Sequence, residues 1–179
     1  TNMIVKKLDI PDVLLFSPSI HEDNRGFLFE LFNQKEFNSQ TGLDIIFVQD
    51  NISTSKKNVL RGLHYQESPM EQGKLVSVIN GAVHDVAVDI RKNSSSYGKW
   101  VIEKLSSKNK RQLWIPPGFA HGFYCLNNET TVLYKTTNFY SAAHEKTIKW
   151  DDDNLKIEWG LKSDPIISNK DKEGENLII

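Results

Sequence analysis

Hydrophobic positions along the chain fall in short runs separated by turn-forming residues, which is the pattern of β-strands. The runs that predict strands are 26–32, 45–49, 59–65, 74–79, 82–90, 100–105, 112–115, 122–126 and 131–137. Asn80-Gly81 separates two of these runs and predicts a tight hairpin. Helical patterning is weak, with about two turns over 34–41 and about one in the C-terminal tail. Many short, evenly spaced strands predict an all-β sandwich or barrel, and periodicity alone does not decide between the two.

Side-chain alternation along a strand predicts which residues share a face. Tyr134 and Tyr140 have the same parity, so an unbroken strand would point both to one face. Arg61 and His64 differ in parity and would point apart, unless Gly62 marks a bulge. The conformation at Gly62 therefore decides whether Arg61 and His64 can serve one site.

Composition and charge narrow the class of protein. The 179 residues suit one domain over 1–179, with 39% hydrophobic and 25% charged residues as in ordinary globular proteins. The net charge is −1 and no basic run occurs, so we expect no nucleic-acid partner. A small anionic ligand stays open, because it needs only a few local cations.

The cysteine content and the N-terminal region bear on location. Cys125 is the one cysteine, which rules out an intrachain disulfide and fits a reducing cytoplasm. It lies in an apolar run, so we expect a buried structural thiol. The N-terminal apolar stretch, 13–16, is too short for a signal-peptide core or a membrane span. We therefore expect a cytoplasmic protein without a membrane partner.

Histidines raise the question of a metal, because β-barrels often bind one through imidazoles. Such a site would combine a His-x-His pair, a later glutamate and a further histidine after a Pro-x-Gly turn. The second half is present as 116–121, Pro-Pro-Gly-Phe-Ala-His. In the first half, His64-Tyr65-Gln66, glutamine stands where the second ligand belongs. The sequence therefore predicts no metal site, and it indicates no other cofactor.

Acid–base chemistry is the second candidate. The segment 61–66, Arg-Gly-Leu-His-Tyr-Gln, combines a cation, an imidazole and a phenol. Taken alone, His64 also fits a hydrogen-bonded structural histidine and Tyr134 a packing residue. Lys74 fits a solvated strand end and Arg25 a turn residue. On these residues alone, the catalytic and the structural interpretations both stay open.

An ordered series of motifs runs from about Leu8 to Asp171. It consists of Arg25-Gly-Phe27, Phe47-Val-Gln-Asp-Asn51, Val59-Leu-Arg-Gly-Leu-His-Tyr-Gln66, Gln72-Gly-Lys-Leu-Val76, Asp85-Val-Ala-Val-Asp-Ile-Arg91, Tyr97-Gly-Lys-Trp100, Trp114-Ile-Pro-Pro-Gly-Phe-Ala-His-Gly-Phe123, Tyr134-Lys-Thr-Thr-Asn-Phe-Tyr140 and Ile148-Lys-Trp-Asp151. In this order the motifs resemble those of the dTDP-4-dehydrorhamnose 3,5-epimerase family. The resemblance, not periodicity, implies a cupin-type jelly-roll β-barrel with a few short helices.

The resemblance also implies a reaction. The substrate would be dTDP-4-dehydro-6-deoxy-D-glucose, inverted at C3 and C5 to dTDP-4-dehydro-L-rhamnose without a cofactor, in the dTDP-L-rhamnose pathway that supplies lipopolysaccharide O-antigen. By position, His64 is similar to the general base and Tyr134 to the general acid. Asp171 corresponds to the carboxylate that pairs with the base, and Lys74 to the residue near the keto oxygen.

Binding residues follow from the same resemblance. Arg25 and Arg61 match diphosphate-binding positions, and Tyr140 matches the aromatic residue that stacks on thymine. Other ligand-contact positions are Glu30, Gln49, Asp50, Asn51, Lys74, His121, Glu145 and Lys170. The family is dimeric with an exchanged N-terminal strand, so Arg25 and Glu30 would reach the partner's site. His84 stands where the family has an aromatic residue, and we interpret it as a packing substitution.

Three alternatives remain at this stage. One is an epimerase that inverts only C3 or only C5, or a keto-isomerase on a related nucleotide sugar. Another is a metal-dependent barrel enzyme, which Gln66 disfavours. The third is a barrel that binds a sugar nucleotide without catalysis, which the joint presence of His64, Lys74 and Tyr134 disfavours.

Overall fold

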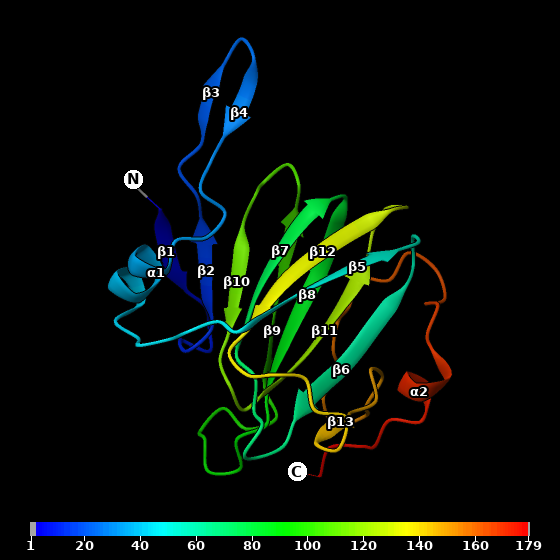
Figure 1. Cartoon of the computed structure of the whole chain (residues 1–179). Coiled ribbons are helices and arrows are strands. Elements are labelled where there is room, and N and C mark those ends of the chain that lie inside the picture. Colours follow the sequence, from blue (N-terminus) through cyan, green and yellow to red (C-terminus); the bar gives the residue numbers. More distant parts are fainter. Residues whose placement is uncertain (1–2, 179) are drawn as a thin grey trace.

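The computed structural model describes residues 3–178, which form thirteen strands and two helices (Figure 1). The strands are β1 (Ile4–Lys7), β2 (Leu14–Ser17), β3 (His21–Asp23), β4 (Gly26–Leu28), β5 (Gln49–Ser55), β6 (Leu60–Gln66), β7 (Lys74–Asn80), β8 (Ala82–Asp89), β9 (Trp100–Ser106), β10 (Gln112–Ile115), β11 (Phe119–Cys125), β12 (Thr130–Thr136) and β13 (Glu145–Thr147). The helices are α1 (Gln34–Thr41) and α2 (Asn169–Lys172). The expected all-β architecture with short helices is confirmed.

Two antiparallel sheets pack face to face as a jelly-roll barrel, which confirms the fold implied by the family resemblance. The larger sheet has the order β1-β2-β10-β7-β12-β5, and the smaller has the order β13-β6-β11-β8-β9. Their inner faces share one core, to which the larger sheet contributes Val76 and Val132 and the smaller contributes Val83 and Phe123. Burial of these apolar faces against each other is the main stabilising term.

Further layers cover part of each outer face. On the larger sheet, the Phe37 ring of α1 lies 5.3–5.5 Å from the rings of Phe16, Phe47 and Trp114. On the smaller sheet, the C-terminal segment packs Leu155 and other apolar residues against the strands. Both outer covers are therefore built from segments that lie outside the central strands.

Most central strands agree with the sequence pattern to within one residue, as does the helix over 34–41. The predictions for 26–32, 45–49 and 122–126 were wrong in extent: β4 ends at Leu28, β5 runs from Gln49 to Ser55, and β11 begins at Phe119. Strand β5 has no apolar inner face, because the residues paired with the inward side of β12 are Gln49, Asn51, Ser53 and Ser55. The hydrophobic pattern also missed the short strands β1, β2, β3 and β13.

The predicted hairpin at Asn80-Gly81 was wrong. Strand β7 belongs to the larger sheet and β8 to the smaller one, so the two strands do not pair. The turn crosses between the sheets and lets Val78 and Val83 enter the same core from opposite sides. Gly81 does adopt a left-handed φ of +81°. A turn signal of this kind predicts the reversal but not which sheet the next strand joins.

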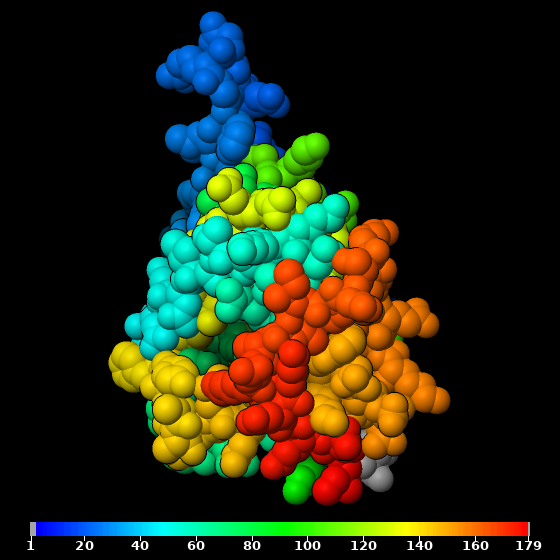
Figure 2. Space-filling model, turned by 90° about the vertical axis from the view of Figure 1, so that its right-hand side faces the viewer, coloured from blue at the N-terminus to red at the C-terminus, as the bar shows by residue number. Residues whose placement is uncertain are grey.

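The β3–β4 hairpin projects from the body of the molecule (Figures 1 and 2). It pairs only with itself, in the register His21 with Leu28 to Asp23 with Gly26. Phe27 is 59% exposed and Leu28 is 68% exposed. Large apolar side chains concentrated on a projecting element are typical of an interaction surface.

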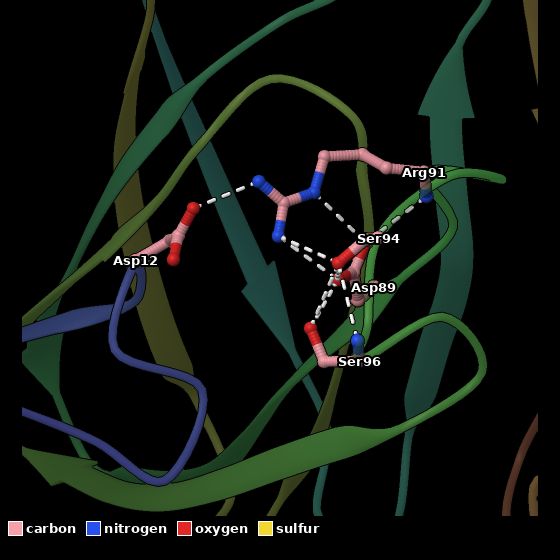
Figure 3. Close-up of polar contacts among 5 residues, drawn as sticks. All are labelled: Asp12, Asp89, Arg91, Ser94 and Ser96. Carbon is pink, nitrogen blue, oxygen red and sulfur yellow. Dashed lines mark hydrogen bonds and ion pairs between the residues drawn. The ribbon is translucent and has the colours of Figure 1, made fainter.

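A polar cluster closes the loop after β8, at the opposite end of the barrel from the hairpin (Figures 1 and 3). The buried Asp89 carboxylate accepts hydrogen bonds from Arg91, from Ser94 at 2.6 Å and from Ser96. Arg91 also reaches Asp12, with 2.8 Å between Nη1 and Oδ2. Burial alone would raise the pKa of Asp89, but these donors hold it far below its usual range.

Two further predictions concern the cysteine and a membrane-spanning segment. Cys125 is a free, fully buried cysteine of the core, and burial raises the pKa of its thiol to about 11, so the expected structural thiol is confirmed. Neither helix within residues 3–178 has the length and apolar character needed to cross a membrane.

Candidate active site

The polar residues of the site come from the inner faces of both sheets. His64 on β6 lies directly opposite His121 on β11 in the smaller sheet. Lys74 on β7 and Tyr134 on β12 belong to the larger sheet, and the Lys74 Nζ lies 5.5 Å from the centre of the Tyr134 ring. Figure 2 shows a recess on this side of the molecule, bordered by the segments around β5 (cyan), β13 (gold) and α2 (red).

Gly62 resolves the parity problem of strand β6. Arg61 pairs with Phe123 and His64 pairs with His121, so three steps on β6 face two on β11. This bulge places Arg61 and His64 on the same side of the sheet. Gly62 has a φ of +130°, and a Cβ there would lie 2.7 Å from the Gly122 Cα. The bulge therefore requires glycine.

His64 and Asp171 form a hydrogen-bonded pair, with 2.7 Å between Nε2 and Oδ1. The other carboxylate oxygen of Asp171 accepts from the Gly62 amide at 3.0 Å. Burial alone would raise the pKa of Asp171, but the hydrogen bond and charge of His64 and the Gly62 amide lower it overall. An ionised carboxylate only accepts, so His64 carries its proton on Nε2 and presents Nδ1 as the basic nitrogen.

His121 makes a second imidazole–carboxylate pair deeper in the barrel. Its Nε2 lies 2.5 Å from Oδ1 of Asp85, and both side chains are buried. Burial lowers the pKa of His121, and the charge of Asp85 only partly opposes this effect. The His121 ring lies 6.4 Å from the Tyr134 ring, centre to centre. His121 is therefore a neighbour of both His64 and Tyr134.

Lys74 is a buried cation. It is 8% exposed, so the alternative interpretation as a solvated strand end is wrong. Burial lowers the pKa of Lys74 to about 8, against the opposing charges of Asp85 and Glu145. Lysine at such a site is still mostly protonated at neutral pH and faces little competition from water, which strengthens its field.

The rim of the recess holds a linked set of polar residues. Glu145 on β13 accepts from the Tyr140 hydroxyl and from the Lys170 ammonium, each at 2.7 Å. Burial would raise the pKa of Glu145, but these two partners lower it. Gln49 accepts from the Tyr140 backbone amide at 3.0 Å and contacts Asn51 through its side-chain amide. Tyr140 thus belongs to the rim, although β12 ends at Thr136 and the unbroken strand does not exist.

Three of the expected ligand contacts lie away from this group within one chain. Arg25 is in the projecting hairpin, where it pairs with Asp23 at 2.6 Å. Glu30 lies just after the hairpin and accepts from Asn33. Asp50 is on the outer face of β5, where it pairs with Lys135 at 3.0 Å. A single chain therefore does not bring Arg25, Glu30 and Asp50 to His64.

Gln66 is used structurally at the position where a metal site would need a ligand. Its amide donates to the carbonyls of Met70 and Phe139, and its oxygen accepts from the Ser141 amide. In the part of the chain that the structure describes, no three His, Cys, Asp or Glu side chains are grouped to hold a metal ion. The side chain that replaces the ligand thus anchors the loop before β13.

The sequence pattern missed two polar residues of the site. Asp85 pairs with His121, and Ser55 accepts from the Arg61 guanidinium at 3.0 Å. The signal for Asp85 is its place in an alternating strand, since it shares the parity of the apolar residues Val83 and Ala87. His84 has the opposite parity and contacts the Trp159 carbonyl at 2.7 Å, outside the site.

Comparison with known proteins supports one family. The family model described as dTDP-4-dehydrorhamnose 3,5-epimerase matches residues 7–178. The dTDP-4-dehydrorhamnose 3,5-epimerase of Shigella flexneri is 54% identical over 176 residues, covering 98% of this chain and 97% of the relative.

Two solved structures of sugar-nucleotide epimerases are similar to this chain over most of its length. A dTDP-6-deoxy-D-glucose-3,5-epimerase from Legionella pneumophila in complex with dTDP-4-keto-L-rhamnose has a TM-score of 0.95 at 46% identity, covering 98% of this chain and 93% of that chain. A 3′-monoepimerase from Streptomyces bikiniensis in complex with dTDP-quinovose has a TM-score of 0.89 at 30% identity, covering 94% and 85%.

Proposed function

Because this chain belongs to the dTDP-4-dehydrorhamnose 3,5-epimerase family, we propose that it inverts C3 and C5 of dTDP-4-dehydro-6-deoxy-D-glucose to give dTDP-4-dehydro-L-rhamnose. The observation that carries the proposal is the placement of His64, paired with Asp171 of α2, on one sheet, with Lys74 and Tyr134 on the sheet that faces it. A base and an acid on opposite walls are what inversion at carbon requires.

His64 is the general base. Protons at C3 and C5 flank the C4 ketone and are weakly acidic, so their removal needs a positioned base. Asp171 orients the imidazole through Nε2 and stabilises the imidazolium that forms, as carboxylates do in other imidazole pairs. Asp171 is itself held by the Gly62 amide, which fixes the direction of the pair.

Lys74 stabilises the enolate. Removal of a proton beside the ketone places negative charge on the C4 oxygen, and a buried ammonium lowers the energy of that charge. The pKa of Lys74 is about 8, so the ammonium is available at neutral pH. Because it is fixed before the reaction, its field costs no reorganisation during proton transfer.

Tyr134 returns a proton to the opposite face of the sugar. A phenol holds its proton at neutral pH and still donates to an enolate carbon. His64 and Tyr134 project from different sheets, so the substrate ring fits between them. The same two groups act at C3 and then at C5 if the ring turns between steps.

Substrate binding uses the rim. Arg61 provides a charge-assisted contact for the diphosphate, and Tyr140 provides an aromatic face for thymine. Gln49, Asn51, Glu145 and Lys170 position these groups or contact the nucleotide. His121 contacts the sugar between His64 and Tyr134.

The active unit is a homodimer with shared sites. Arg25 and Glu30 lie on and beside a projecting hairpin that exposes Phe27 and Leu28, so they reach the partner's site and not their own. Isologous pairing of two copies would bury Phe27 and Leu28 and complete each recess. We place this reaction in the cytoplasm, in the pathway that makes dTDP-L-rhamnose.

No metal or other cofactor takes part in the proposed steps. Gln66 is committed to three backbone groups, and Nε2 of both His64 and His121 is committed to a carboxylate. Activity should therefore persist after treatment with EDTA. Activity that returns only on addition of a divalent metal would contradict this part of the proposal.

The decisive experiment is incubation with dTDP-4-dehydro-6-deoxy-D-glucose in D2O, followed by NMR. The proposed function predicts deuterium at both C3 and C5 and the L-rhamno configuration in the product. Deuterium and inversion at one carbon only would assign a mono-epimerase, and isomerisation of the ketone would assign a keto-isomerase. Absence of any exchange would leave a binding protein.

A further inference from the structure

Asp85 is a fully buried carboxylate in the middle of β8, with a side chain that is 0% exposed. Its same-face neighbours, Val83 and Ala87, belong to the central core. A charge in such surroundings is strongly destabilising unless other charges or donors compensate it. The proposed base, acid and enolate stabiliser do not include Asp85, so its burial calls for an explanation.

One oxygen of Asp85 fixes the state of His121. The 2.5 Å contact joins Oδ1 to Nε2, and an ionised carboxylate accepts the proton from this nitrogen. His121 then presents Nδ1 away from Asp85. His121 on β11 is the cross-strand neighbour of His64 on β6. Its tautomer therefore determines whether it presents a hydrogen-bond acceptor or a donor beside the proposed base.

The second oxygen of Asp85 supplies a charge without a direct partner. Within residues 3–178, Oδ2 makes no hydrogen bond, and no lysine or arginine lies within ion-pair distance of Asp85. A short series of contacts brings Asp85 near Lys74: the ring of its partner His121 lies 6.4 Å from the Tyr134 ring, centre to centre, and the Lys74 Nζ lies 5.5 Å from the centre of the same ring. The charge of Asp85 opposes the effect of burial on the pKa of Lys74, as does that of Glu145, which is already paired with Lys170. The other titratable or charged groups on the inner faces of strands around β7 are Arg61, His64, Glu103, His121, Cys125 and Tyr134.

We propose that Asp85 is a positioning residue, which holds His121 with its proton on Nε2 and supplies the buried negative charge that keeps Lys74 protonated. The proposal rests on the proposed function, in which the Lys74 ammonium stabilises the enolate. Asp85 acts through His121 and Lys74 and does not itself contact the substrate.

Asp85→Asn tests the charge, because it keeps the size and the acceptor oxygen. Lys74 must be protonated to act, so activity falls as the pH rises through its pKa. Loss of the Asp85 charge lowers that pKa, so the alkaline limb of the kcat/KM profile should move to lower pH by about one unit or more. At pH 8, kcat should fall about fivefold or more, while KM changes little.

Glu103→Gln is the matched control. Glu103 is the cross-strand neighbour of Asp85 on β9 and does not contact His121. It should leave the alkaline limb in place. A purely structural role for Asp85 predicts that Asp85→Asn lowers the melting temperature without moving this limb, and that result would overturn the proposal.

Two NMR measurements separate this proposal from the proposed function, because neither needs turnover. The Lys74 side chain should titrate at lower pH in Asp85→Asn than in the wild type. In the wild type, the 15N shifts of His121 should report a protonated Nε2, a test that holds even if the variant does not fold. Unchanged Lys74 titration, or a proton on Nδ1, contradicts the role of Asp85 even if the enzyme is active. A shifted titration in a protein without epimerase activity keeps the Asp85–Lys74 coupling and rejects the function.

Discussion

Asp171 lies 107 residues after His64 in the chain, yet its carboxylate is 2.7 Å from the His64 ring. The contact links the bulge of β6 to helix α2, where the Asp171 amide also donates to Ser168 at the start of the helix. The orientation of the proposed base therefore depends on a segment that adds only one turn of helix to the fold.

His64→Asn and Tyr134→Phe should fail in different ways. His64→Asn cannot remove the first proton, so exchange at C3 and C5 in D2O should collapse while the nucleotide still binds. Tyr134→Phe keeps the base, so some exchange with retained configuration should remain, while inversion falls by about 10²–10⁴-fold. The ratio of exchange to inversion, read by NMR, distinguishes the two variants. Normal exchange in His64→Asn would refute the role assignment.

Gly62→Ala should disrupt both the fold and the site. The added Cβ would lie 2.7 Å from Gly122 and 2.9 Å from the His121 carbonyl, at a φ of +130°. We expect a loss of about 2–5 kcal/mol in the free energy of unfolding, from strain and overpacking together. Gly26→Ala is the control, since Gly26 has a φ of +134° with no atom within 4 Å of the added Cβ. If denaturant unfolding shows the same loss of unfolding free energy in both variants, crowding of the added Cβ against Gly122 and the His121 carbonyl does not contribute.

Lys74→Met should abolish catalysis and stabilise the fold. The pKa of Lys74 is lowered to about 8 in the folded chain, so the buried ammonium destabilises the native state at neutral pH. Replacement by methionine should add about 1–3 kcal/mol to the free energy of unfolding. Between pH 8 and about 10.4, the unfolded chain binds more protons at this residue, so wild-type stability should rise with pH there. The methionine variant should lack this rise; if it is instead less stable than the wild type, the electrostatic argument fails.

Arg61→Ala and Tyr140→Ala should weaken nucleotide binding. Loss of the guanidinium removes a charge-assisted contact and should cost about 1.5–3 kcal/mol in affinity. Loss of the aromatic face should cost about 1–3 kcal/mol. Calorimetry with dTDP measures both, with the exposed Arg111→Ala as the charge-matched control. Unchanged affinity in both test variants would place the diphosphate and thymine elsewhere.

Mixed dimers test the exchange of the hairpin. If Arg25 serves the partner's site, Arg25→Ala and His64→Asn homodimers are each impaired, but a mixed dimer contains one site with both native residues. Random mixing yields half mixed dimers, so about a quarter of wild-type activity should return. The control mixes His64→Asn with Tyr134→Phe. Both residues belong to the site of their own chain, so a mixed dimer of these two variants contains no native site and no activity should return.

The central strands of the fold follow from the sequence, whereas β5 and the short peripheral strands do not. Strands over 74–79, 82–90 and 112–115 have apolar inner faces, so hydrophobic patterning finds them. Hydrophobic patterning did not find the full extent of strand β5, because its inner face is polar. The pairing of His64 with Asp171 came from family resemblance, because no local pattern relates positions 107 residues apart. Residue parity indicates a bulge at Gly62, but the close approach of Gly62 to Gly122 depends on the neighbouring strand β11.

The Asp89 cluster and the reaction centre respond to different ranges of pH. Its donors hold the pKa of Asp89 well below the value in an unfolded chain, so its contribution to stability is complete above about pH 4 and is lost only in strong acid. In the reaction centre, burial lowers the pKa of Lys74 to about 8. A shift from pH 7 to 9 therefore alters the charge of the reaction centre while the loop after β8 stays locked. Mild alkali should act on this protein as a reversible chemical switch of the site and not as a denaturant.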